Sequence, residues 1–196
     1  MSHHGLTDLI PKEVYAISAV SNRIDDRIPF GTFREDWAEG IDPPSARHPK
    51  LVRGVKVNWS RLTNDPGIGV TVGYSFGVPI YLTDLERTLI DAIDRPDKSG
   101  GIAKSLQAWK IADSLDVDKI VHYVDRYKNK VLRQKIGFLL GQLGYTHPGL
   151  EEWRRGLIRG SSVKLVSSEP YSPIHSKEWN LSLNIPSSVL SIINEE

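Results

Sequence analysis

The sequence of 196 residues contains no cysteine. This absence excludes a disulfide framework, a thiolate metal site and a cysteine nucleophile, and it is compatible with a reducing compartment. The sequence also has no long apolar run, and its start lacks a charged segment followed by a hydrophobic one. It therefore predicts neither a membrane span nor a signal peptide, and we expect a soluble, cytoplasmic protein.

An excess of one charge is missing as well, because 25 Lys and Arg residues stand against 24 Asp and Glu residues, a formal net charge of +1. A balanced total exerts no general attraction on nucleic acid, so any phosphate binding has to come from a local cluster of cations. The length suits a single domain that buries its own core without support from a metal or a disulfide.

Metal-binding motifs are also absent, because none of the six histidines forms a metal-binding pair at helical spacing. The Gly-x-Ser-x-Gly spacing at residues 73–77 lies between two predicted strands and not at the strand-to-helix turn that a nucleophile elbow requires. Gly67 and Gly69 precede a predicted strand and do not open a helix, so a turn is a better interpretation than a phosphate-binding loop. We expect no catalytic residues, no metal ion and no cofactor, and an enzyme of an unrecognised class is the least favoured alternative.

The first part of the chain is rich in residues that favour β-strands, and it predicts one mostly buried strand followed by a small antiparallel sheet. A turn at residues 64–67 separates the first two strands of that sheet. Residues 21–50 carry many prolines and glycines, which predicts an irregular connection with one helical turn around residues 34–39. The predicted strands are residues 14–20, 52–62, 70–74 and 78–82.

A helix with its own start and stop signals follows. Thr83 and Glu86 have the spacing of a capping box, so the helix is expected to begin at about Asp84. Arg87 and Asp91 carry opposite charges one turn apart on this helix. Its apolar side is formed by Leu85, Leu89, Ile90 and Ile93, and its stop signals are Pro96, Gly100 and Gly101.

Helical periodicity continues beyond this unit, and strand-forming residues then return. Asp116 and Asp118 are plausible N-caps, and Gly144 is expected to close a helix in the left-handed conformation. The predicted helices are residues 102–114, 118–129, 131–143 and 150–159, followed by strands at 163–167 and 179–185 and a short helix from Ser187 or Ser188.

This order of elements predicts an α+β fold, in which a small antiparallel sheet and C-terminal strands pack against a cluster of about five helices. We expect one domain over residues 1–196. Its parts are a strand-rich region at 12–82, a helical region at 84–160, and C-terminal strands with a short helix at 162–194.

The helix unit at residues 83–101 resembles a "TxxERTLID…P…GG" segment of the AbiEi family, the antitoxins and transcriptional regulators of AbiE-type (type IV) toxin–antitoxin systems. Three further segments resemble that family in the same order along the chain. They are residues 4–15, with the run from Gly5 to Asp8, residues 130–144, with Arg133 and Gly144, and residues 177–185, with Trp179 and Asn184.

The resemblance implies an antitoxin domain that takes part in phage defence and counteracts a nucleotidyltransferase toxin, without necessarily forming a stable complex with it. Proteins of the family also carry an N-terminal winged helix that binds DNA, and the resemblance covers only the part that follows this module. Autorepression by the family's usual route is therefore not expected for this sequence.

Two classes of enzyme have motifs that can be compared with this sequence, the nucleotidyltransferase itself and a restriction-type nuclease. The first needs a Gly-Ser grip before an Asp-x-Asp pair, but Gly160 and Ser161 follow Asp116 and Asp118, and a capping role explains both aspartates. The nuclease needs a carboxylate two residues before a lysine, and the sequence has no Asp-x-Lys or Glu-x-Lys. Neither enzyme is therefore expected.

Basic residues gather on the later helices. They could bind phosphates of DNA or RNA, or an acidic protein surface, but interspersed acidic residues make a solvated helical face the favoured interpretation. Trp109 and Trp153 are expected in the core and not as binding platforms. The candidate binding residues are Lys119, Arg126, Lys128, Lys130, Arg133, Lys135, Arg154, Arg155 and Arg159.

Overall fold

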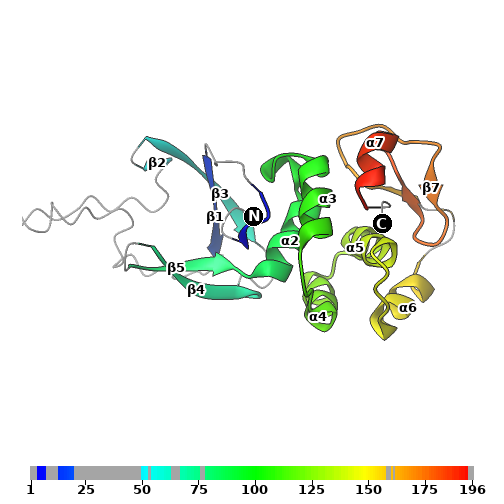
Figure 1. The fold of residues 1–196 in the computed structure, drawn as a ribbon, viewed down its shortest axis with the longest axis horizontal. Coiled ribbons are helices and arrows are strands. Elements are labelled where there is room, and N and C mark those ends of the chain that lie inside the picture. Colours follow the sequence, from blue (N-terminus) through cyan, green and yellow to red (C-terminus); the bar gives the residue numbers. More distant parts are fainter. Residues whose placement is uncertain are drawn as a thin grey trace, which may run out of the picture. The chain divides into compact units, whose positions relative to one another are not determined.

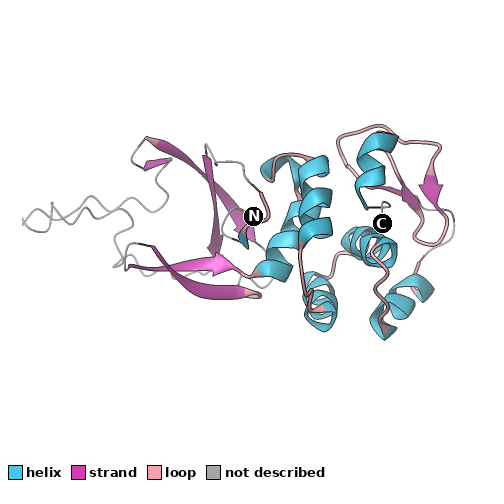
Figure 2. Cartoon of the chain, in the orientation of Figure 1, coloured by secondary structure: helices cyan, strands magenta, loops and turns pink. Residues whose placement is uncertain are grey.

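The structure is a computed structural model that describes residues 4–7, 13–19, 50–52, 54–62, 67–75, 78–157, 160 and 162–193 (Figures 1 and 2). The described helices and short sheets confirm the predicted α+β class. The chain divides into two compact units, residues 9–67 and residues 1–8 with 68–196, and each is described by itself. The helical turn expected around residues 34–39 lies outside the described residues.

The unit of residues 9–67 contains a three-stranded sheet of order β1-β3-β2, formed by β1 (Glu13–Ala19), β2 (Leu51–Val52) and β3 (Val55–Leu62). β1 pairs with β3 in parallel, whereas β2 pairs with β3 antiparallel. β1 was expected to be mostly buried, but Val14 and Tyr15 are 48% and 45% exposed, so that expectation is wrong at these residues. Strand propensity predicts extended backbone and carries no information about which neighbour covers each face.

The strand pairing predicted for the antiparallel sheet is wrong in one respect. β4 (Val70–Ser75) and β5 (Val78–Thr83) form a separate antiparallel hairpin in the larger unit, and β3 is not part of its sheet in the described structure. Gly73 permits the close packing inside this hairpin, because a Cβ there would lie 2.8 Å from Cδ1 of Leu82. The backbone N–H of Asp84 donates to the carbonyl of Gly69 at 2.8 Å and ties the end of the hairpin to the next helix.

The helix after the hairpin is α2 (Leu85–Asp94), and its cap differs from the expected one. The N-cap is Asp84, whose carboxylate accepts from the backbone N–H of Arg87 at 2.9 Å. Thr83 is the last residue of β5, and its hydroxyl bonds to that of Thr88 at 2.7 Å, so it is not available for the cap. The stop signals act as predicted, since α2 ends before the 3-10 turn η2 (Pro96–Lys98) and Gly101 precedes the next helix.

The expected helices follow with ends that differ by a few residues: α3 (Ile102–Ile111), α4 (Val117–Tyr127), α5 (Lys130–Gln142) and α6 (Pro148–Arg155). Asp116 caps α4 as predicted, by accepting from the backbone N–H of Lys119 at 2.9 Å. Asp118 is not a cap, because it lies inside α4 and its carboxylate bonds to His147 at 2.7 Å. Gly144 has the predicted left-handed conformation, with φ of +78°.

The C-terminal part forms a small sheet of order β6-β8-β7, from β6 (Val163–Lys164), β7 (His175–Ser176) and β8 (Leu181–Ser182). The side chain of Asn184 bonds to both the N–H and the carbonyl of Val166, at 3.0 and 2.8 Å, and so extends the pairing beyond β6. β7 was not predicted. The helix α7 (Ser187–Leu190) and the 3-10 turn η3 (Ser191–Ile193) follow.

The core of the larger unit lies among α2, α3, α4 and α5 and extends to the C-terminal sheet. Trp109 and Trp153 are 1% and 5% exposed, which confirms that both are core residues. The largest side chains with less than 2% exposure are Trp109, Arg87, Leu89, Ile90, Ile93, Leu106, Ile120, Leu132, Ile136, Leu139, Leu140 and Leu165.

Candidate functional site

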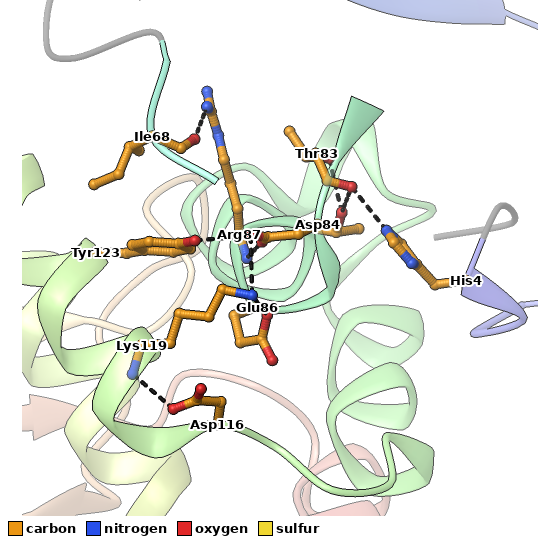
Figure 3. Close-up of polar contacts among 10 residues, drawn as sticks. His4, Ile68, Thr83, Asp84, Glu86, Arg87, Asp116, Lys119 and Tyr123 are labelled. Carbon is orange, nitrogen blue, oxygen red and sulfur yellow. Dashed lines mark hydrogen bonds and ion pairs between the residues drawn. The ribbon is translucent and has the colours of Figure 1, made fainter. Parts of the chain in front are cut away.

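The polar side chains at the start of α2 form one cluster with α4 (Figure 3). Asp84 is central to it. One carboxylate oxygen of Asp84 caps α2, and the other accepts from the hydroxyl of Tyr123 at 2.7 Å and lies 3.2 Å from Nζ of Lys119. Glu86, which is 5% exposed, bonds to the same ammonium at 2.7 Å. Two carboxylates from α2 therefore share one cation from α4.

The charges in this cluster stabilise each other. Burial alone lowers the pKa of the Lys119 ammonium, but the hydrogen bonds to Glu86 and Asp84 outweigh burial and raise that pKa above its ordinary value. Burial and the hydrogen bond to Asp84 raise the pKa of Tyr123 to about 12. At neutral pH, Lys119 is therefore charged and Tyr123 keeps its proton.

Arg87 follows Glu86 on α2 and is fully buried. Its guanidinium donates to the carbonyl of Ile68, just before β4, and its Nε lies 3.5 Å from Asp91, which confirms the predicted pair. The hydroxyl of Tyr127 donates to Asp91 at 2.7 Å. Burial raises the pKa of the Asp91 carboxyl, although the contacts with Tyr127 and Arg87 act in the opposite direction.

Each of these side chains has a partner within the fold, and together they join the hairpin, α2 and α4. A general acid or base needs a group that faces a substrate, and a charge already held in a mutual pair is poorly suited to that role. The arrangement is that of a structural brace. Within the described residues, no group of three or more His, Asp or Glu side chains is placed to hold a metal ion.

The structure places the predicted basic residues in different environments. Lys119, Arg133 and Arg154 contact carboxylates, with Arg133 at 2.8 Å from Asp125 and Arg154 between Glu151 and Glu178. Lys135 is 3% exposed and therefore cannot meet phosphates at the surface, which corrects its assignment as a binding candidate. Arg126, Lys128, Lys130 and Arg155 are exposed, and Arg159 lies outside the described residues.

A cavity that the sequence analysis did not predict lies at the C-terminal end of α5, with a volume of about 250 Å³. Phe138 and Gly141 of α5, Leu150 of α6 and Trp179 line it, together with polar side chains from the same segments. The spacing of Gly137 and Gly141 was the available signal, because glycines four residues apart share one helix face and can accommodate a large ring.

None of the described helices combines the length and the apolar composition that a membrane crossing requires. No family model matches the sequence. A search of curated proteins also finds no match. The resemblance to the AbiEi family therefore stays a prediction that rests on the residues themselves.

Proposed function

We propose that this chain is a non-enzymatic antitoxin-type domain of a type IV, AbiE-like toxin–antitoxin and phage-defence system. It acts in the cytoplasm and counteracts a nucleotidyltransferase toxin. The observation that carries the proposal is that three of the segments resembling the family, together with residues 4–7 from the start of the first segment, meet in one compact unit although they are far apart in sequence.

The contacts between these segments are specific. The ring Nε2 of His4 bonds to the carbonyl of Thr83 at 2.8 Å (Figure 3), and Leu6 is part of the core. α2 contacts α5, and the side-chain amide of Gln134 on α5 donates to the carbonyl of Trp179 at 2.8 Å. A shared fold requires such contacts among these segments, and they support the proposal in that sense.

The roles of the polar residues give a second line of support. In the segment of residues 83–101, Asp84 caps a helix, Glu86 pairs with Lys119 and Arg87 pairs with Asp91. Such groups favour action through a folded surface over acid–base chemistry. Binding to DNA or RNA has weaker support, because Lys119, Arg133 and Arg154 already contact carboxylates.

Co-expression tests the proposal. A nucleotidyltransferase toxin of an AbiE-type system is induced in a bacterial host, with and without this chain on a second inducible plasmid, and viable cells are counted over time. A toxin variant without its metal-binding carboxylates shows whether growth arrest depends on nucleotidyl transfer. We expect this chain to restore growth. Continued arrest while the chain accumulates as folded protein contradicts the proposal.

A further inference from the structure

Trp179 differs from the other buried tryptophans of the larger unit in its hydrogen bonding. The indole N–H of Trp109 donates to the carbonyl of Leu89 at 3.0 Å, and that of Trp153 donates to Asp125 at 2.8 Å. Trp179 is 3% exposed, yet its indole N–H donates to no residue in the described part of the chain. Its Nε1 is not among the fully buried polar atoms without a partner, so this N–H reaches solvent and can donate to a bound molecule.

The neighbouring glycines show where that N–H lies. A Cβ on Gly137 would meet the six-membered ring of Trp179 at 2.3 Å, whereas a Cβ on Gly141 would lie 3.9 Å from Nε1. The ring therefore lies along α5, with its nitrogen near the later glycine. Gly141 and Trp179 both line the cavity of about 250 Å³, so the unpaired N–H is at the cavity wall.

The other cavity residues define the chemistry of an occupant. Phe138, Tyr145 and Leu150 provide apolar surface. Glu151 and Glu178 lie on either side of Arg154, and both carboxylate side chains are 55% exposed. Two carboxylates and one guanidinium leave a local excess of negative charge. The C-terminal end of α5 has the same sign, because the helix dipole is negative at that end.

An anionic ligand is disfavoured at this position, since it would compete with two carboxylates for Arg154. A neutral carbonyl can accept from the Trp179 N–H, and a cation can approach the two glutamates. The cavity is smaller than typical pockets for drug-sized ligands, which are about 300–1,000 Å³, so it suits a short segment.

We propose that this cavity binds a short peptide segment with a basic side chain. A main-chain carbonyl of the peptide accepts from Nε1 of Trp179, and its cationic side chain pairs with Glu151 and Glu178. This inference is independent of the antitoxin role, because it depends only on the residues of the cavity.

A titration followed by NMR tests it on the full chain. The probe is acetyl-Gly-Arg-amide, and acetyl-Gly-Glu-amide is the control of opposite charge. The indole N–H signals of the five tryptophans are recorded, and Trp179→Phe identifies the signal of Trp179. At about 10 mM probe, which exceeds a Kd of roughly 1 mM tenfold, the Trp179 signal should move downfield and approach saturation, while those of Trp109 and Trp153 stay in place.

Two glutamate variants provide a matched comparison. Glu178→Gln removes one carboxylate of the cavity, and Glu152→Gln removes a carboxylate of α6 that does not line it. We expect Glu178→Gln to weaken binding of the arginine peptide severalfold and Glu152→Gln to leave it unchanged. The proposal is overturned if the Trp179 signal does not respond to the arginine peptide, if the glutamate peptide shifts it equally, or if both variants behave alike.

Discussion

Trp179 occupies the space that Gly137 leaves open, since a Cβ at residue 137 would lie 2.3 Å from Cη2 and from Cζ3 of the indole. An alanine at this position must displace either the ring or α5. We expect Gly137→Ala to lower the free energy of unfolding by about 1–3 kcal/mol, as overpacked core substitutions do. Urea denaturation followed by circular dichroism measures the change.

Gly141 is the matched control on the same helix. A Cβ there would lie 3.9 Å from Nε1 of Trp179, which is an ordinary contact. Alanine also favours a helix over glycine by about 1 kcal/mol. Gly141→Ala should therefore leave the stability unchanged or raise it. Equal losses for the two variants would show that the ring does not rest against residue 137.

The cap of α2 provides a second prediction. Asp84→Ala removes the acceptor of the Arg87 N–H and the contacts with Tyr123 and Lys119, so we expect it to cost about 1–2 kcal/mol of unfolding free energy. Thr83→Val keeps a β-branched residue in β5 and loses mainly the bond to Thr88, so it should cost less. Thermal denaturation measures the stability of both variants. A larger loss of stability for Thr83→Val than for Asp84→Ala would indicate that Thr83 is the cap of α2.

Lys135 provides a prediction about pH. Burial lowers the pKa of its ammonium from the ordinary value of 10.5, with partial compensation by Asp94. The unfolded chain therefore holds this proton more tightly than the folded protein does. At pH values between the lowered pKa and 10.5, the contribution of Lys135 to the stability of the fold rises with pH. At lower pH, the folded protein bears the full free-energy cost of burying the charged ammonium.

Lys135→Met removes the buried charge and keeps a side chain of similar length. At pH 7 we expect it to raise the free energy of unfolding by about 1–3 kcal/mol, because Asp94 compensates the burial of the ammonium only in part. The gain should shrink as the pH approaches 10.5. Urea denaturation at several pH values measures it, with the exposed Lys130→Met as control. If both variants have the same effect, the buried ammonium carries no penalty.

Nucleic-acid binding is tested by a gel-shift series with duplex DNA and single-stranded RNA at rising salt. Because Lys119, Arg133 and Arg154 contact carboxylates, we expect no retardation even at low salt. Retardation that weakens steeply as the salt concentration rises would instead indicate contacts between basic side chains and phosphates. It would favour the alternative function, a module that binds DNA or RNA.

Local signals in the sequence were sufficient for much of the fold. The Arg87–Asp91 pair, the cap at Asp116 and the left-handed Gly144 all depend on residues within a few positions of each other. Helical spacing could also have placed Lys135 in the core, because it follows Leu132 by three residues and precedes Leu139 by four, and both leucines are buried.

Long-range pairing could not be predicted in the same way. β1 pairs in parallel with β3, and a long connection separates the two strands in the sequence. Alternation of apolar and polar residues predicts that a segment is a strand, but it does not predict which strand pairs with it. Asp118 was expected to cap a helix, but its carboxylate bonds to His147, which lies 29 residues away. The indole of Trp179 next to Gly137 likewise depends on how the C-terminal segment returns to α5.

Growth rescue by Glu86→Gln tests the central claim, that this chain counteracts the toxin without catalysis by residues 83–101. The substitution removes a charge but keeps the size of the side chain, and Asp84 still contacts Lys119. We expect the variant to restore viable counts to the level of the unmodified chain during toxin induction. Loss of rescue by a variant that folds and melts like the unmodified chain would contradict the account.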